Sequence, residues 1–317
     1  MDQLAPCSIE SLNQAAKRLQ IGALVAFPTE TVYGLGVDAE NEPAVARMYA
    51  IKGRPAKHPV IVHISNQNLV SYWAEEIPDY AIALMRKFWP GPMTLILRRS
   101  KSAKDFITGG QEFVGLRIPS NPIALKLLGE FESLGGHGVA APSANRFGSV
   151  SPTSASDVAE EIGELLREED LILDGGASEV GVESTIIDCS RELPRILRLG
   201  AVTEAMIESI VPIDTDSNLE EIRVSGSLTR HYSPHAKVVT DREAKPGEGL
   251  IGLSDIQTPD GVVRLSAPDS IEDYARSLYG ALRKGDSEGL RVIVVNPPRG
   301  EGLAAAIRDR ILRASTH

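Results

Sequence analysis

A short apolar run that breaks abruptly into polar residues constrains the fold of this chain more than any other feature. Residues 23–27 are all apolar, and this pattern predicts a buried β-strand. The segment 28–36, with the sequence PTETVYGLG, follows directly and carries Thr29, Glu30 and Thr31. Two hydroxyls and a carboxylate therefore stand at the end of a predicted strand, where open α/β sheets tend to bind ligands. The pattern favours an α/β fold with a ligand site at this edge.

Length and composition indicate a globular protein of two domains. A chain of 317 residues exceeds what one hydrophobic core usually serves. The apolar fraction of 42% is that of a globular protein, and no apolar run reaches the about 18 residues that suggest a membrane span. The N-terminal segment MDQLAPCSIE lacks the basic and apolar regions of a signal peptide. We therefore expect a cytoplasmic protein with no membrane partner.

Charge and cysteine content exclude two further classes. The formal net charge is −10, and a dedicated nucleic-acid-binding protein would usually carry a basic patch or stripe. Net charge still leaves room for a local basic pocket. The two cysteines, Cys7 and Cys189, have no metal-type spacing and suggest no disulfide framework. We expect two reduced thiols and no metal bound by the protein itself.

The first part of the chain, residues 1–205, predicts a strand-rich α/β domain. Ser8 is a plausible N-cap for the first helix, and Pro90-Gly91-Pro92 separates a helix from the next strand. Helices are expected at residues 8–20, 43–52, 79–88, 122–131 and 155–166, and strands at residues 23–27, 59–64, 93–98, 114–118, 138–141, 171–173, 184–188 and 196–199.

The chain changes character after this domain. Residues 213–229 are acidic, polar and poor in apolar periodicity, which indicates an extended linker, and we assign residues 206–235 to a linker or lid. Residues 236–317 predict a second, smaller α/β domain. Its strands are expected at residues 237–240, 250–253, 262–265 and 292–295, and its helices at residues 271–284 and 303–313.

Two short motifs in this second part carry little weight. Residues 247–252 match GxGxxG, but that fingerprint needs the glycines to open a helix, and residues 250–253 predict a strand instead. His231 and His235 have the spacing of zinc ligands on a helix, but Ser233-Pro234 between them argues against a helix. We expect neither a dinucleotide site nor a metal site here.

Three polar groups in the first domain are candidates for binding an anionic ligand. Lys52 and Arg54 lie two residues apart on a bent segment with the sequence KGRP, where they can face one polyphosphate. Arg117 lies in an otherwise apolar strand and needs an anionic partner or an open face. Ser143 and Asn145 follow a strand of small residues and can hydrogen-bond phosphate or ribose oxygens. Taken singly, the KGRP segment has an alternative as a solvated turn and the Ser143 loop as a simple turn, so none of the three groups decides the function alone.

The motifs together resemble the YrdC-type domain family of threonylcarbamoyl-AMP synthases in its long, two-domain form. They occur in the order PTETVYGLG, KGRP, HPVIVHI, LRIPSNP, APSAN, SVSPT, GVESTIID, ILRLG and then HYSP. The resemblance implies a twisted mixed α/β sheet with a concave basic cavity, followed by a smaller Rossmann-like domain. It also implies the synthesis of threonylcarbamoyl-AMP and pyrophosphate from L-threonine, bicarbonate or CO2, and ATP with Mg2+.

Site residues are carried over from the matching motifs. The resemblance implies catalytic roles for Lys52, Arg54, Ser143 and Asn145, binding of L-threonine by Thr31, His63, Arg117, Ala141 and Ser184, and binding of ATP by Arg54, His58, Ser143, Ser151, Arg198 and Tyr232. Fixed cations and hydrogen-bond donors would stabilise the charge that grows on the phosphoryl oxygens.

The resemblance also implies partners. A downstream threonylcarbamoyl transferase complex would receive the adenylate, so tRNA would be engaged only indirectly. The linker bearing Tyr232 is the expected lid, because an unstable carbamate benefits from exclusion of water.

Two alternatives remain. One is a carbamoyl-phosphate-dependent carbamoyltransferase, a multidomain class with cysteine-rich zinc modules that two lone cysteines disfavour. The other is an RNA-binding or ribosome-assembly factor, which the acidic composition disfavours.

Overall fold

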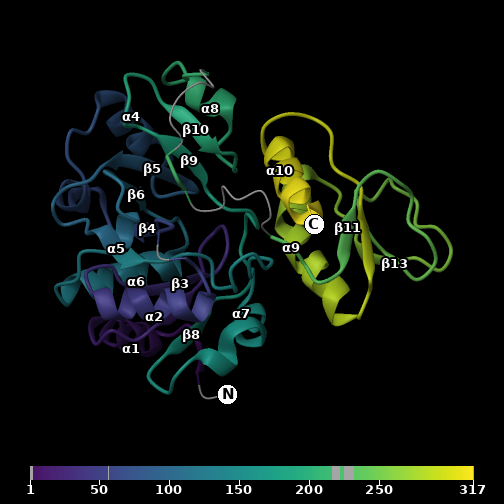
Figure 1. The fold of residues 1–317 in the computed structure, drawn as a ribbon, viewed down its shortest axis with the longest axis horizontal. Coiled ribbons are helices and arrows are strands. Elements are labelled where there is room, and N and C mark those ends of the chain that lie inside the picture. The colour runs from purple at the N-terminus through teal and green to yellow at the C-terminus, as the bar shows by residue number, and fades with distance from the viewer. Residues whose placement is uncertain (1–2, 56, 216–221, 225–231, 317) are drawn as a thin grey trace.

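The computed structural model contains two α/β domains that pack side by side (Figure 1). It describes residues 3–55, 57–215, 222–224 and 232–316. Within these ranges, no helix is long and apolar enough to cross a membrane. The larger domain is built on a ten-stranded sheet and the smaller one on a four-stranded sheet, as the resemblance implied.

The ten-stranded sheet mixes parallel and antiparallel pairs. Parallel pairing joins β1 to β8, β8 to β2, β4 to β6 and β5 to β9, and the other neighbours are antiparallel. In spatial order the strands are β1 (Leu4–Pro6), β8 (Leu171–Asp174), β2 (Val25–Phe27), β3 (Gly34–Asp38), β7 (Val139–Ala140), β4 (Ile61–His63), β6 (Phe113–Arg117), β5 (Met93–Arg98), β9 (Thr185–Asp188) and β10 (Arg195–Arg198).

Helices cover both faces of this sheet, because successive side chains of its strands point to opposite sides. On β2, Val25 and Phe27 pack into the core formed with α1 and α6, whereas Ala26 packs into the core on the other face. The α-helices of this domain are α1 (Ile9–Gln20), α2 (Glu42–Lys52), α3 (Val70–Trp73), α4 (Asp79–Phe88), α5 (Asp105–Thr108), α6 (Pro122–Ser133), α7 (Ala155–Ile162) and α8 (Glu204–Glu208), with 3-10 turns at Gln67–Leu69 and Gly163–Leu165.

Local sequence signals explain most of these elements. Ser8 caps α1 by accepting from the backbone N–H of Ser11, which confirms the predicted helix start. The main departure is β3, which occupies residues that the sequence analysis left as a polar loop. A Cβ at Gly36 would lie 2.7 Å from the Phe27 ring, so glycine here permits the close packing of a hairpin with β2. The glycine-rich composition therefore concealed a strand.

The second domain has a four-stranded sheet that is parallel throughout. The spatial order is β11 (Lys237–Val239), β14 (Val292–Val295), β12 (Gly249–Ile251) and β13 (Val263–Ser266). The helices α9 (Ile271–Ser287) and α10 (Leu303–Ser315) lie on the face that is turned toward the first domain (Figure 1). The GxGxxG match at residues 247–252 leads into strand β12, as predicted, so its glycines do not open a helix.

The two domains share a buried interface. Val32, Val150 and Val182 of the first domain pack in one apolar cluster with Tyr274 and Tyr279 of α9. A Cβ at Gly181, whose φ is 78°, would lie 2.4 Å from the backbone carbonyl oxygen of Ala275, so the backbones meet closely there. The interface adjoins the polar pocket described below.

Parts of the predicted linker pack against the first domain. Ile207 and Val211 belong to its main core, so this core continues beyond residue 205. Val224 is buried with Ile96 and Ile186, and Arg223 donates to the carbonyl oxygen of Gly109 at 3.0 Å. Residues 216–221 and 225–231 of the predicted linker, His231 among them, lie outside the described residues.

Candidate functional site

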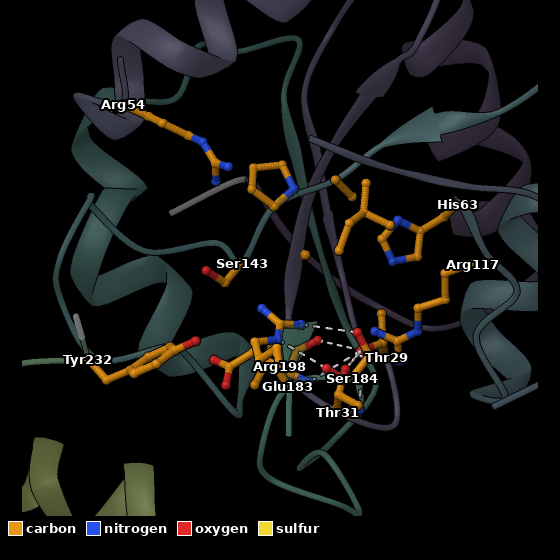
Figure 2. Close-up of a pocket in the computed structure, with 15 residues that line it drawn as sticks. Thr29, Thr31, Arg54, His63, Arg117, Ser143, Glu183, Ser184, Arg198 and Tyr232 are labelled. Atoms are coloured by element: carbon orange, nitrogen blue, oxygen red, sulfur yellow. Dashed lines mark hydrogen bonds between the residues drawn. The ribbon is translucent and has the colours of Figure 1, made fainter. Parts of the chain in front are cut away.

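A pocket lined by many polar side chains opens beside the ten-stranded sheet, at the edge that the PTETVYGLG segment predicted (Figure 2). Side chains from strand ends and loops converge on it, with His63 and Arg117 on one side and Arg54 and Tyr232 on the other. The lining residues are Thr29, Thr31, Val32, Gly34, Arg54, Ile61, His63, Arg117, Ala141, Pro142, Ser143, Glu183, Ser184, Arg198 and Tyr232.

Strand register brings His63 and Arg117 together. The two residues are direct partners in the parallel pairing of β4 with β6, so their side chains leave the sheet on the same face. His63 is 4% exposed and Arg117 is 5% exposed. On the same side, the hydroxyls of Thr31 and Thr29 lie 2.8 Å apart. We call this part of the pocket the Arg117 end.

Arg117 and Glu30 form a buried ion pair that leaves several hydrogen-bonding groups unused. Nη2 of Arg117 lies 2.8 Å from Oε1 of Glu30. Within the described residues, neither these two atoms nor Nε of Arg117 has a hydrogen bond of proper alignment. A buried guanidinium with unused N–H groups suits a ligand carboxylate, which can accept two parallel hydrogen bonds. Glu30 stood in the motif but was not among the predicted site residues.

His63 is neutral at physiological pH. Burial, and then the positive charge of Arg117, lower the pKa of its imidazole to about 3. Its Nδ1 has no hydrogen-bond partner among the described residues. Nδ1 of the ring can therefore form one hydrogen bond with a ligand without adding charge to the Arg117 end.

The other end of the pocket holds two more cations, the half-buried Arg54 and the buried Arg198, and we call it the Arg54 end. Arg54 follows α2, whose C-cap Gly53 has a left-handed φ of 63°, and its Nη2 donates to the carbonyl oxygen of Pro59 at 2.7 Å. Arg198 donates through Nε to the carbonyl oxygen of Ser184 at 3.0 Å and through Nη2 to its hydroxyl at 3.1 Å. Burial lowers the pKa of both guanidinium groups. An anionic ligand would relieve this gathering of positive charge.

Lys52 and Asn145 lie behind the pocket, whereas Ser143 lies in its wall. Nζ of Lys52 donates to the backbone carbonyl oxygens of Ser143 and Asn145. Nδ2 of Asn145 donates to the carbonyl oxygen of Ser149 at 2.8 Å. Burial, followed by the charge of Arg54, lowers the pKa of Lys52 well below its ordinary value. These contacts shape the loop that presents Ser143, so in this structure Lys52 and Asn145 act on the pocket through that loop.

Three predicted nucleotide ligands have different placements. Tyr232 lies in the pocket wall with 1% of its surface exposed, and its ring stacks on Tyr279 at 5.5 Å between centroids. Ser151 does not line the pocket, but its hydroxyl donates to Oε1 of Glu183, which does, at 2.7 Å. His58 packs its ring edge against Phe147 and does not line the pocket. Of the predicted threonine ligands, all five line the pocket.

Sequence reasoning missed the acidic members of the site. Glu183 lines the pocket between Val182 and Ser184, inside the motif GVESTIID from which only the serine was chosen. The available signal was that Glu183 directly precedes Ser184, a predicted ligand of threonine. Among the described residues, no group of three or more His, Cys, Asp or Glu side chains is placed to hold a metal ion.

Two family models match consecutive parts of the chain. Residues 17–200 match the Sua5/YciO/YrdC family model, described as "Telomere recombination", and residues 202–316 match the model "Threonylcarbamoyl-AMP synthase, C-terminal domain". Relatives named threonylcarbamoyl-AMP synthase include those of Pyrococcus abyssi, at 38% identity over 95% of this chain and 93% of the relative, and of Bacillus subtilis, at 35% over 95% and 92%. A putative threonylcarbamoyl-AMP synthase of Mycobacterium tuberculosis is 34% identical over 64% of this chain and 90% of its own length.

A solved structure extends the likeness to the whole fold. The crystal structure of Pyrococcus abyssi Sua5 complexed with L-threonine matches with a TM-score of 0.87 and 37% identity, covering 98% of this chain and 96% of that one. The chain therefore belongs to the Sua5/YciO/YrdC family, in the two-domain form that carries the threonylcarbamoyl-AMP synthase C-terminal domain.

Proposed function

We propose that the protein is an L-threonylcarbamoyladenylate synthase, a nucleotidyltransferase that makes threonylcarbamoyl-AMP and pyrophosphate from L-threonine, bicarbonate or CO2, and ATP. The observation that carries the proposal is a single pocket with the buried Arg117 at one end and two further arginines, Arg54 and Arg198, at the other. The near full-length likeness to enzymes named threonylcarbamoyl-AMP synthase supports the same reaction.

The Arg117 end suits an amino acid. Arg117 would hold the carboxylate of L-threonine in a charge-assisted, two-point contact. Thr31 and Ser184 offer hydroxyls, and the neutral ring of His63 offers one further hydrogen bond for the substrate's hydroxyl or amine. Glu30 balances the charge of Arg117 before the ligand enters.

The Arg54 end suits the nucleotide. Arg54 and Arg198 would meet phosphate oxygens, and the ring of Tyr232 would lie against the adenylate. Ser143 offers a hydroxyl between the two ends of the pocket (Figure 2). His58 and Ser151 remain predicted nucleotide ligands, with Ser151 linked to the pocket through Glu183.

The reaction needs no covalent intermediate on the protein. The amine of threonine adds to CO2 and loses a proton to give a carbamate. A carbamate oxygen then attacks the α-phosphorus, the bond to the bridging β-phosphate oxygen breaks, and pyrophosphate leaves with that electron pair. Fixed cations stabilise the growing charge on the phosphoryl oxygens and on the leaving group. Cys7 and Cys189 do not line the pocket, and burial raises the pKa of both thiols.

Mg2+ would enter with ATP. The acidic groups beside the pocket, Glu30 and Glu183, already face Arg117 and Arg310, and this arrangement fits an ion carried on the phosphates. When bound, Mg2+ supplies charge neutralisation of the leaving pyrophosphate.

The product's chemistry indicates how the protein is used. A mixed carbamic–phosphoric anhydride hydrolyses readily, so we propose direct transfer to a threonylcarbamoyl transferase complex that modifies tRNA, in the cytoplasm. The protein itself would engage tRNA only indirectly, in keeping with its net charge of −10.

Pyrophosphate release tests the proposed function. Purified protein is mixed with ATP, Mg2+, bicarbonate and each of a panel of amino acids. We expect release that requires both threonine and bicarbonate, together with a new adenylate that liberates AMP on hydrolysis. Release that is independent of threonine, or that proceeds equally with carbamoyl phosphate in place of bicarbonate, would overturn the proposal.

A further inference from the structure

Glu183 is a carboxylate in the wall of an otherwise cationic pocket, and residues of both domains hold it. Its Oε1 accepts from the hydroxyl of Ser151 at 2.7 Å. Its Oε2 accepts from the hydroxyl of Tyr279 on α9 at 2.8 Å and from Nε of Arg310 on α10 at 2.8 Å. Glu183 is 6% exposed, so water does little to screen these contacts.

Arg310 brings a buried positive charge of the second domain into the interface. The residue is 1% exposed, and its Nη2 donates to the carbonyl oxygen of Leu199, the residue after Arg198, at 2.7 Å. Its guanidinium carbon lies 5.3 Å from the centre of the Tyr232 ring. One side chain thus contacts the carboxylate, the strand end and the aromatic ring that form the Arg54 end.

The negative charge of Glu183 opposes phosphate binding unless another group neutralises it, and Arg310 is placed to do so. A bare carboxylate at this position would repel phosphate and would attract Arg198, the other cation close enough to act on it. Burial alone would raise the pKa of Glu183, but the charges of Arg310 and Arg198 and the hydrogen bond from Ser151 lower it to about 2. Glu183 is therefore ionised. It needs a cationic partner other than Arg198, because Arg198 is the arginine that would bind the phosphates.

We propose that Arg310, assisted by Tyr279, is a positioning residue for nucleotide binding: it neutralises Glu183 and so leaves Arg198 directed toward the ligand's phosphates. The second domain would then be part of the active site. This inference rests on the proposed function in that the anionic ligand is ATP. Neither residue lines the pocket, so the effect should appear in the affinity for ATP and not in that for threonine.

A charge-rescue experiment tests the proposal. Arg310→Met leaves the Glu183 carboxylate buried beside the nucleotide without its main partner, and we expect the KM for ATP to rise on the order of 30-fold, since breaking a buried charged pair is costly. The double variant Glu183→Gln/Arg310→Met removes both charges and keeps the hydrogen bonds to Ser151 and Tyr279. We expect it to recover most of the ATP affinity, with the KM for threonine within about twofold of wild type throughout.

Matched variants separate this effect from a general loss of domain contact. Arg276 also crosses the interface, donating to the carbonyl oxygen of Glu179 at 3.0 Å, but it is exposed and does not line the pocket. Arg276→Gln should leave the KM for ATP unchanged. Tyr279→Phe keeps the ring on Tyr232 and deletes one donor to Glu183, so it should raise that KM several-fold. If Arg310→Met does not fold, Tyr279→Phe and the double variant carry the test.

The possible outcomes are distinct. A double variant as impaired as the single one, a KM for threonine that rises in parallel, or an equal effect of Arg276→Gln would each overturn the positioning role. Wild-type protein that releases no pyrophosphate with threonine, bicarbonate and ATP would instead refute the proposed function. Direct titration with ATP in the absence of threonine then still measures whether Arg310 governs nucleotide affinity.

Discussion

The two ends of the pocket are built in different ways. At the Arg117 end, His63 and Arg117 are register partners on neighbouring strands, and Ser184 directly precedes β9. At the Arg54 end, Arg54 follows a helix and Tyr232 precedes the second domain. The first arrangement follows from folding one sheet. The second also requires that two domains dock correctly.

This difference has a consequence for the two substrates. A site fixed by strand register should bind its ligand with little dependence on the rest of the chain. A site assembled across a domain interface gains or loses affinity whenever docking changes. The amino acid end should therefore respond to local substitutions, and the nucleotide end should respond to local and distant ones.

The largest effect should come from removing the cation of the Arg117 end. We expect Arg117→Ala to raise the KM for threonine about 100-fold or more, because the substrate carboxylate loses a charged partner in a buried site. The KM for ATP should change little. Steady-state kinetics with each substrate varied in turn would measure both values.

A lysine variant sharpens this first prediction. Arg117→Ala also leaves Glu30 buried without its counter-ion, so the midpoint of thermal unfolding should fall. Arg117→Lys keeps the charge and loses the two-point geometry, and it should give an intermediate KM with a smaller change in stability. If both variants raised the KM for ATP and not that for threonine, the assignment of the two ends would be reversed.

The two ends also differed in how far the sequence could predict them. Strands at residues 59–64 and 114–118 were expected from their apolar patterns, and both form. Nothing in those patterns could reveal that the two strands are parallel neighbours, because pairing partners are set by packing of the whole sheet. The motif resemblance supplied His63 and Arg117 as two of five threonine ligands, and the register now explains why these two meet.

The support of the Arg54 end was beyond sequence reasoning. Arg310 is one of 33 lysine and arginine residues, and its helix is amphipathic like many others. Its burial depends on the docking of α10 against residues more than a hundred positions earlier, which no local pattern encodes. Lys52 and Asn145 show the reverse case. The motifs selected both as site residues, but could not indicate that their side chains bind the backbone of a loop.

The second prediction compares two cations that the sequence could not tell apart. Arg54→Met removes a group that lines the pocket, so we expect kcat to fall on the order of 100-fold with little loss of stability. Lys52→Met leaves two backbone carbonyls without their donor and should lower the free energy of unfolding by about 1–3 kcal/mol, with a smaller fall in kcat. Denaturant unfolding and turnover should be measured on the same preparations. Equal stability of the two variants would contradict this division.

The smallest expected effect concerns His63 and pH. Its folded pKa of about 3 lies below the ordinary value of 6.5, so between these values the unfolded chain binds a proton that the folded chain does not. The contribution of this neutral ring to stability is therefore complete above pH 6.5 and is lost as pH falls below it, at about 1.4 kcal/mol per pH unit at most. His63→Gln should remove that dependence.

The measurement is the free energy of unfolding of wild type and His63→Gln from pH 5 to 7. Glu183 titrates lower, because its folded pKa of about 2 and its ordinary value of 4.5 both lie below this window. Burial also lowers the pKa of His58, but this contribution is common to both proteins and cancels in the difference. The difference in stability should therefore shrink as pH falls from 6.5 to 5. A constant difference would mean that His63 is not held neutral by burial beside Arg117, and the uncharged hydrogen bond assigned to it at the amino acid end would have to be abandoned.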